Sequence, residues 1–104
     1  MDRIIGVETE YAIRAEDSAG KVIPPDLLAS TLIDVAHECL ISLPDESSNG
    51  LYLANGARFY IDAGAHPEFT TPECPDPWTA VRYVRGGEHI LGYLIRRMRG
   101  RFGE

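Results

Sequence analysis

The sequence lacks the segments that would carry a protein into or across a membrane. No apolar run in its 104 residues approaches the roughly 20 residues that a membrane span needs. The first residues, MDRIIGVETEY, show no basic stretch followed by an apolar stretch and a small-residue cleavage site, so no signal peptide is predicted. We therefore expect no membrane partner and a cytoplasmic location.

Cysteine is scarce, and Cys39 and Cys74 do not form a metal-binding pattern. No CxxC pair and no Cys/His spacing typical of zinc is present, so we predict no zinc site. Two reduced thiols are favoured over a disulfide, which the sequence nevertheless permits. The GxxxxGK[ST] loop is also absent, and its absence excludes a P-loop nucleotide-binding fold.

Positive charge is sparse outside the C-terminal end. The formal net charge is −6, and four of the ten basic residues lie within the last nine positions, RRMRGRFGE. An acidic body argues against general nucleic-acid binding. The arginine-rich end could contact phosphates or a partner, but the solvated C-terminal end of a helix, where cations are favourable, is the better interpretation.

Two segments have the apolar periodicity of helices, residues 25–42 and residues 77–102. Pro25 and Asp76 suit the starts of these helices, as a first-turn proline and an N-cap. The Gly86-Gly87 pair interrupts the second pattern and predicts a kinked or loosened helix there.

The rest of the chain predicts strands and loops. Residues 3–14, RIIGVETEYAIR, alternate like a strand, and LYLANGARFYID predicts two short strands joined at Asn55-Gly56. LPDESSNG is predicted to be a loop, and the proline-rich AGAHPEFTTPECPDP an irregular segment. The order β-α-β-β-α predicts one α+β domain over residues 1–104, an antiparallel sheet with helices packed on one face.

Glu8 and Glu10 point to the same side of the first predicted strand, because side chains two positions apart share a face. Two like charges at this spacing repel each other unless a cation lies between them. Carboxylate oxygens are ligands that magnesium accepts, which makes a metal site one interpretation. The alternative, favoured by this pair alone, is an edge strand whose two glutamates face water.

Arg58, Tyr60 and Asp62 alternate with apolar residues and should therefore share one face of a strand. The guanidinium fork of arginine suits phosphate, and a phenol and a carboxylate supply oxygen atoms beside it. The alternative is a structural Arg58–Asp62 salt bridge with a tyrosine packed on the sheet surface. The residues by themselves leave both interpretations open.

The segment after this strand adds further acids close to the predicted strand end, Glu68 and Glu73. Loops beside strand ends are common places for functional sites. His66 precedes a proline, which restricts it to extended conformations, so we expect it to hold the loop by a hydrogen bond rather than to bind metal or act as a base. Trp78 is expected to lie in the core.

IIGVETEYAI and NGARFYIDAGAHPEFTTPEC together resemble the motifs of the Pup ligase and depupylase family, which attaches or removes the small protein modifier Pup. The resemblance extends over nearly the whole chain and includes the helix after PEC. That family is similar to glutamine synthetase and the glutamate–cysteine ligases, which are carboxylate–amine ligases. The resemblance therefore implies the N-terminal part of a glutamine-synthetase-like sheet cradle.

The resemblance implies an ATP- and magnesium-dependent site on that cradle. Its magnesium ligands would be Glu8, Tyr60 and Glu68, with Glu10 in a supporting metal role. The magnesium would offset charge on a phosphoryl group in transfer.

The resemblance also implies how the reaction proceeds. Arg58 and Thr71 would contact ATP, which converts the C-terminal glutamate side chain of Pup into an acyl phosphate. A lysine of a protein substrate would then attack and form an isopeptide bond. Asp62 would be the catalytic base that takes the proton from the ammonium group.

Within the family, the chain is closer to the ligases than to the depupylases. SLPDESSNGLYLANGAR leaves no room for the long insertion that depupylases carry between the two motifs, and the spacing in DAGAHPE matches the ligases. Pro72 in TTPEC is instead typical of depupylases, which leaves open the role of Thr71 and the subclass.

The family's enzymes are several hundred residues long, so we expect these 104 residues to be an N-terminal portion that is inactive alone. A non-catalytic oligomerising fragment is the alternative. We expect self-association, because a partial cradle would leave strand edges unpaired and one helix face apolar. The apolar residues of that helix face are Leu91, Leu94, Ile95, Met98 and Phe102.

Overall fold

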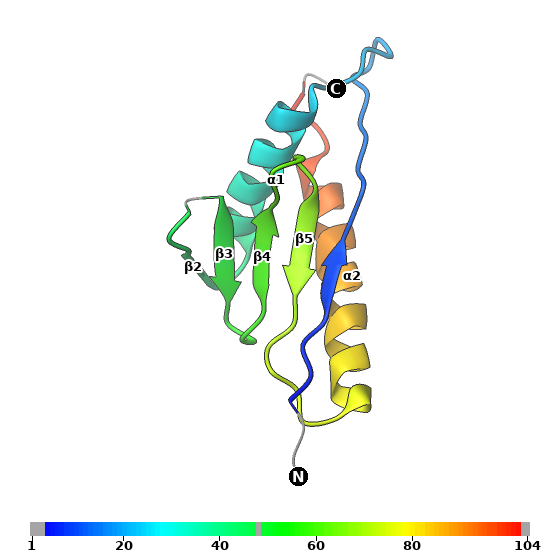
Figure 1. Cartoon of the computed structure of the whole chain (residues 1–104). Coiled ribbons are helices and arrows are strands. Elements are labelled where there is room, and N and C mark those ends of the chain that lie inside the picture. Colours follow the sequence, from blue (N-terminus) through cyan, green and yellow to red (C-terminus); the bar gives the residue numbers. More distant parts are fainter. Residues whose placement is uncertain (1–3, 48, 103–104) are drawn as a thin grey trace.

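In the described part of the chain, five short strands form one antiparallel sheet in the order β1-β5-β4-β3-β2 (Figure 1). The computed structural model describes residues 4–47 and 49–102. The strands are β1 (Glu8–Glu10), β2 (Ser42–Pro44), β3 (Gly50–Leu53), β4 (Arg58–Ile61) and β5 (Pro67–Thr70). Strands β1 and β2 form the two edges of this sheet, so the segment nearest the N-terminus lies beside β5 rather than beside β2.

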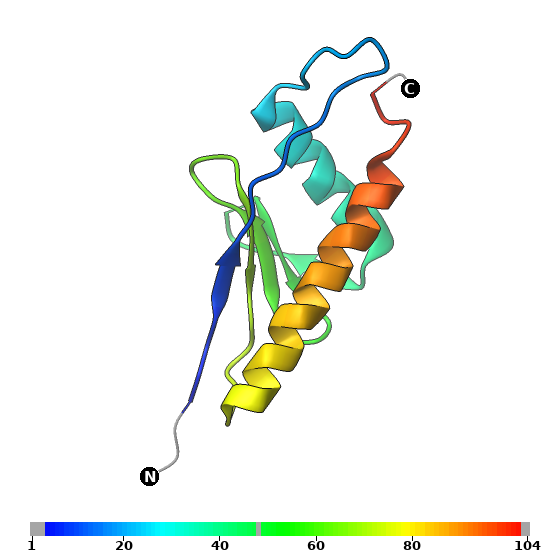
Figure 2. The same cartoon turned by 90° about the vertical axis from the view of Figure 1, so that its right-hand side faces the viewer.

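Both helices, α1 (Pro25–Cys39) and α2 (Pro77–Met98), cover the same face of the sheet (Figure 2). The predicted α+β fold with helices on one face is therefore confirmed. Asp76 caps α2 as expected, since its carboxylate accepts a 2.7 Å hydrogen bond from the Thr79 backbone N–H. Among the described residues, no helix combines the length and the apolar character needed to cross a membrane.

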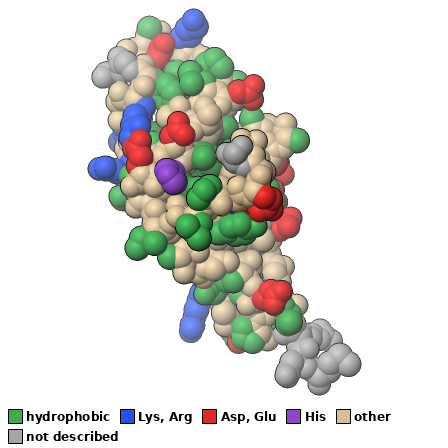
Figure 3. All heavy atoms as spheres, turned by 90° about the vertical axis from the view of Figure 1, so that its left-hand side faces the viewer, with side chains coloured by type: hydrophobic (Ala, Val, Ile, Leu, Met, Phe, Trp, Pro, Cys, Tyr) green, Lys and Arg blue, Asp and Glu red, His purple; other side chains and the backbone are tan. Residues whose placement is uncertain are grey.

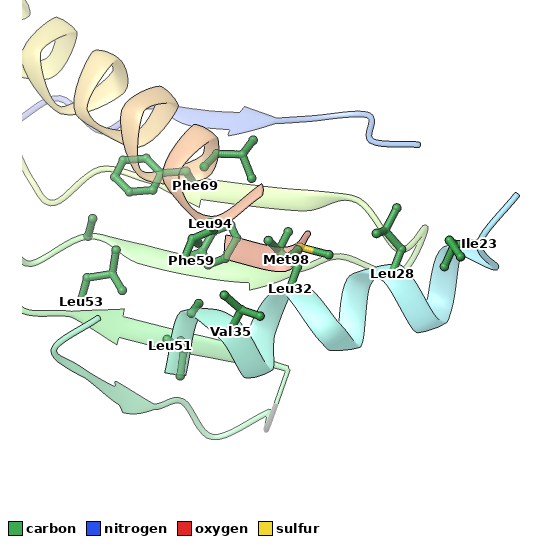
Figure 4. Packing of buried hydrophobic residues seen from close by; sticks show 13 residues of the cluster. Ile23, Leu28, Leu32, Val35, Leu51, Leu53, Phe59, Phe69, Leu94 and Met98 are labelled. Carbon is green, nitrogen blue, oxygen red and sulfur yellow. The ribbon is translucent and has the colours of Figure 1, made fainter. Parts of the chain in front are cut away.

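The core lies between the sheet and the two helices (Figure 4). Strand alternation directs Leu51, Phe59 and Phe69 toward the helices, and these three side chains are almost completely buried. Leu32 of α1 and Leu94 of α2 are fully buried against them. The helices thus leave the opposite face of the sheet uncovered.

Two strands were not predicted. Strand β2 (Ser42–Pro44) takes the last residue of the predicted helix and the start of the predicted loop, and Pro67–Thr70, predicted as irregular, forms β5. Both contain a proline at one end, where a missing N–H costs little. The asparagine-glycine hairpin between β3 and β4 is confirmed, with Gly56 at φ 89°.

The helices end earlier than the periodicity predicts. Helix α1 stops at Cys39 instead of 42, because Leu40 turns to extended backbone and the Ile41 carbonyl accepts a hydrogen bond from the Ala54 N–H. Helix α2 stops at Met98 instead of 102, just before Gly100 adopts a φ of 87°. In both cases the apolar pattern continues past the last helical residue.

Helix α2 continues through Gly86-Gly87, where a kink or loosening was predicted. The structure gives Gly87 a packing role instead. A Cβ atom built on Gly87 would lie 2.6 Å from the Phe69 ring, whereas one built on Gly86 would meet nothing within 4 Å. Gly87 therefore lets α2 approach β5 closely.

The placement of Trp78 in the core was wrong. Trp78 lies in the first turn of α2 and is 77% exposed.

Trp78 is the protein's single tryptophan, so tryptophan fluorescence reports on this surface alone. We expect its fluorescence emission to resemble that of free tryptophan and to shift little when urea unfolds the protein. A blue-shifted emission that depends on protein concentration would instead show that an associating partner covers Trp78.

The reason given for self-association is partly removed by the structure. Leu91, Leu94 and Met98 of α2 are buried, and α2 packs against α1. Exposed apolar side chains remain at the β2 edge, where Ile41 is 84% and Leu43 is 71% exposed. Figure 3, viewed from the β2 side, shows hydrophobic side chains together with acidic ones on this surface. Self-association thus stays a prediction, which now depends on the sheet edges and on Ile95 of α2, 41% of which remains exposed.

Candidate functional site

The uncovered face of the sheet brings together most of the predicted site residues. Glu10 pairs with Glu68, which pairs with Tyr60 on β4. In the next row, Glu8 pairs with Thr70, which pairs with Arg58. Directly opposed residues of neighbouring antiparallel strands point to the same side. We define the open face by Glu8, Glu10, Tyr52, Arg58, Tyr60, Glu68 and Thr70.

The two glutamates of β1 lie at the edge of this face. Glu8 and Glu10 are exposed, whereas Thr9 between them is half-buried toward the helices. The predicted sharing of one face is confirmed. Because β1 is an edge strand and both carboxylates reach water, their mutual repulsion by itself does not require a cation.

Tyr60 stands in the centre of the open face between Arg58 and the row of acids. Burial and the adjacent Glu68 carboxylate raise the pKa of the Tyr60 phenol, so the phenol is neutral near pH 7. Glu8 contributes to the same shift. Together Tyr60, Glu68 and Glu8 offer oxygen donors, the ligand type that magnesium prefers, and this donor set fits the expected metal.

Asp62 lies just beyond β4 and closes a tight loop with His66. Its Oδ1 accepts hydrogen bonds from the backbone N–H groups of Gly64 (2.8 Å) and His66 (2.9 Å). These bonds, first that from His66, lower the pKa of the Asp62 carboxyl, so this group is ionised at neutral pH. The expectation that His66 holds the loop by a hydrogen bond is confirmed.

His66 also links Asp62 to β1. Its Nδ1 lies 3.0 Å from Glu10 Oε1 and 3.5 Å from Asp62 Oδ2. Ligand atoms of Glu10, Asp62 and His66 all lie within 4.8 Å of one another, close enough to surround an ion. Asp62 is thereby brought beside the open face although it is not part of a strand.

Arg58 does not form the salt bridge with Asp62 that the sequence left open as a structural alternative. It forms an ion pair with Asp45, in which Nη2 and Oδ2 are 2.7 Å apart. Its guanidinium also stacks over the Tyr60 ring, 4.2 Å from the ring centre. The residue predicted to contact phosphate is thus fixed by two neighbours.

Asp62 lies beside the open face, whereas the predicted site residue Thr71 is buried outside it. Its side chain is buried, and its hydroxyl accepts a bond from the Val7 N–H and donates one to the Pro72 carbonyl. In this structure the hydroxyl of Thr71 holds the backbone just beyond β5, between the Glu8–Thr70 pair and the Ile5–Cys74 bridge.

The sequence did not indicate the role of Asp45, which lies next to the site and contacts Arg58. It lies in LPDESSNG, predicted as an ordinary polar loop, and is thirteen residues from Arg58. A loop aspartate is common enough that its type gave no signal. The one clue was Gly50 at the end of this loop, whose lack of a side chain makes room for Asp45.

Comparison with known proteins finds similarity between this chain and one enzyme family. A family model described as Pup-ligase protein matches residues 3–103. A Pup–protein ligase of Xylanimonas cellulosilytica is 40% identical over 96 residues, which is 91% of this chain and 20% of that protein. Another, of Corynebacterium kroppenstedtii, is 36% identical over 93 residues, 88% of this chain and 18% of that protein.

The fold has a similar counterpart among solved structures. In the crystal structure of the complex between Prokaryotic Ubiquitin-like Protein Pup and its Ligase PafA, one chain matches with a TM-score of 0.69 and 27% identity. The match covers 89% of this chain and 17% of that one. The chain therefore spans about a fifth of the length of the relatives that it matches.

Proposed function

Because this chain belongs to the Pup-ligase protein family, we propose that it forms the N-terminal catalytic portion of an ATP- and magnesium-dependent ligase. That ligase joins the C-terminal glutamate of Pup to lysines of protein substrates. The observation that carries the proposal is the strand register, which sets Glu8, Arg58, Tyr60 and Glu68 in two adjacent rows of one uncovered face.

In this proposal the open face binds the triphosphate of ATP and its magnesium. Glu8, Tyr60 and Glu68 hold the magnesium, and Glu10 supports them from the neighbouring position on β1. When bound, the magnesium offsets the charge that develops on the phosphoryl group in transfer. Arg58 binds a phosphate oxygen through a free edge of its guanidinium, a charge-assisted contact.

The reaction needs ATP because a carboxylate is a poor electrophile. The γ-phosphoryl group passes to the glutamate side chain of Pup, which leaves ADP and an acyl phosphate. The substrate lysine attacks the acyl carbon, an isopeptide bond forms, and phosphate departs. Asp62 takes the proton from the attacking nitrogen, and the loop N–H groups of Gly64 and His66 hold its carboxylate in position for this role.

Two parts of the earlier interpretation have less support. A contact from Thr71 to ATP stays a prediction, because its hydroxyl is already bonded to Val7 and Pro72. The depupylase alternative depends on Pro72, whereas the relatives described above are ligases. We further propose that this chain is inactive without the remaining four fifths of such a ligase.

An NMR titration tests whether the open face is the nucleotide site. We expect Mg²⁺ with ATP to shift backbone amide signals of β1, β4 and β5, while Mg²⁺ alone binds weakly because the phosphate ligands are absent. Glu68→Gln should weaken MgATP binding by about tenfold, as expected for the loss of one charged ligand. Glu73→Gln is the matched control, an exposed acid outside the open face.

The proposal fails if saturating MgATP shifts no signals, or shifts those of α1 and α2 instead of the three strands. Equal affinity of Glu68→Gln and the Glu73→Gln control would likewise exclude Glu68 as a ligand. Complete absence of nucleotide binding, together with concentration-dependent association, would favour the oligomerising fragment.

A further inference from the structure

Asp45 is the one buried acidic side chain in the described part of the chain. It directly follows β2, and its side chain has no exposed area. Burial of a carboxylate is costly unless the charge is paired and its oxygens accept hydrogen bonds. A buried aspartate in a surface loop therefore needs an explanation.

Both oxygens of Asp45 are fully used by neighbouring groups. Oδ1 accepts hydrogen bonds from the Ser47 backbone N–H (2.9 Å) and hydroxyl (2.6 Å). Oδ2 accepts two from Arg58, from Nε at 3.1 Å and from Nη2 at 2.7 Å. Burial opposes ionisation, but the Ser47 and Arg58 hydrogen bonds outweigh it and keep the pKa of Asp45 below its ordinary value.

Arg58 is oriented by these bonds and by aromatic rings. The two bonds to one oxygen fix one edge of the guanidinium, and its carbon lies 4.2 Å from the Tyr60 ring centre and 5.9 Å from that of Tyr52. Among the described residues, Nη1 has no hydrogen-bond partner, and 32% of the side chain is exposed. Asp45 thus holds the Nε–Nη2 edge of the guanidinium, while Nη1 remains available to a ligand.

Gly50 makes this arrangement possible. It pairs with Tyr60 across β3 and β4, so a side chain there would stand on the open face. A Cβ atom on Gly50 would overlap Asp45 Oδ2 and lie 2.6 Å from Tyr60 Cβ. The missing side chain leaves the space that the Asp45 carboxylate occupies on its way to Arg58.

We propose that Asp45 is a positioning residue, which holds Arg58 so that its free Nη1 edge receives a phosphate oxygen of a nucleoside triphosphate. A free arginine would lose much rotamer freedom on binding a phosphate, and Asp45 removes that freedom beforehand. Asp45 also offsets the charge of Arg58, so its benefit is orientation rather than attraction. The inference rests on the proposed nucleotide site.

The first experiment measures the orientation of Arg58 directly and without nucleotide. The Nε–H signal of Arg58, assigned through its loss in Arg58→Lys, should exchange slowly with solvent in the wild-type chain. Asp45→Asn and Gly50→Ala should each accelerate this exchange by about tenfold or more, because each removes or displaces the charged acceptor. Glu46→Gln is the matched control, since this neighbouring acid contacts Tyr52 and not Arg58. Unchanged exchange in Asp45→Asn would overturn the proposal.

The second experiment asks whether this orientation serves phosphate binding. Asp45→Asn should weaken MgATP binding about tenfold, but leave it unchanged when Arg58 is already replaced by methionine. A merely structural role of Asp45 would weaken binding equally in both backgrounds, and that result would overturn the proposal. If the wild-type chain binds no MgATP although Arg58 Nε–H is protected, the proposed function fails while the Asp45–Arg58 orientation stands.

Discussion

Replacing Phe69 with alanine is expected to lower the free energy of unfolding by about 3–5 kcal/mol, the usual cost of removing a buried aromatic ring. Phe69 is 1% exposed and lies on β5, between Phe59 of β4 and Thr9 of β1. Its ring also contacts Gly87 of α2. The cavity left by alanine would therefore lie between the sheet and α2.

The same replacement should disturb the open face. Phe69 lies between Glu68 and Thr70, which point to that face, so loss of its packing releases the strand that carries them. Phe69→Leu keeps most of the volume and should cost less than about 1.5 kcal/mol. Urea unfolding measures both variants, provided that the transition remains two-state.

Glu68→Gln is the control for this prediction, because it changes the opposite face of the same strand and should alter stability by no more than about 0.5 kcal/mol. A loss below about 1 kcal/mol in Phe69→Ala would contradict the tight packing described for the ring.

The second large effect is expected from a single methyl group on α2. Gly87→Ala should destabilise the protein by about 1–3 kcal/mol through overpacking, because the new Cβ would lie 2.6–2.8 Å from three atoms of the Phe69 ring. Gly86→Ala, one position earlier in the same helix, meets nothing within 4 Å. It should stabilise the protein by up to about 1 kcal/mol, the difference in helix propensity.

This pair of variants separates packing from propensity, since both change glycine to alanine in the middle of α2. Thermal unfolding and urea unfolding should rank them in opposite directions from the wild type. A side chain smaller than the Phe69 ring should relieve the clash. Phe69→Leu is therefore expected to lower the free energy of unfolding less in the Gly87→Ala background than alone. Similar stabilities of Gly86→Ala and Gly87→Ala would show that α2 is not as close to β5 as described.

The sequence alone determined which residues share a face. Period-two alternation set Glu8 with Glu10, and Arg58 with Tyr60, on the side away from the apolar residues, and the structure confirms this. Helical periodicity and the Asp76 cap likewise located both helices. These features depend on residues within a few positions of one another, where backbone geometry imposes the pattern.

The sequence did not determine where the short proline-containing strands pair. Strand β5 places Glu68 between Glu10 and Tyr60, yet PEFT is too short and too irregular in context to predict a strand. Trp78 was misplaced for a related reason, because the apolar pattern of α2 continues beyond the part that the sheet and α1 cover.

The tertiary structure alone decided the partner of Arg58. Asp62 stood at a suitable spacing on the same predicted face, whereas Asp45 lay in a loop that no periodicity describes. Asp62 is instead bound by the backbone of its own loop, and Asp45 reaches Arg58 across Gly50. Local sequence specifies which way a side chain points, but the identity of its partner depends on how distant segments pack, and that packing follows from the whole core rather than from any one segment.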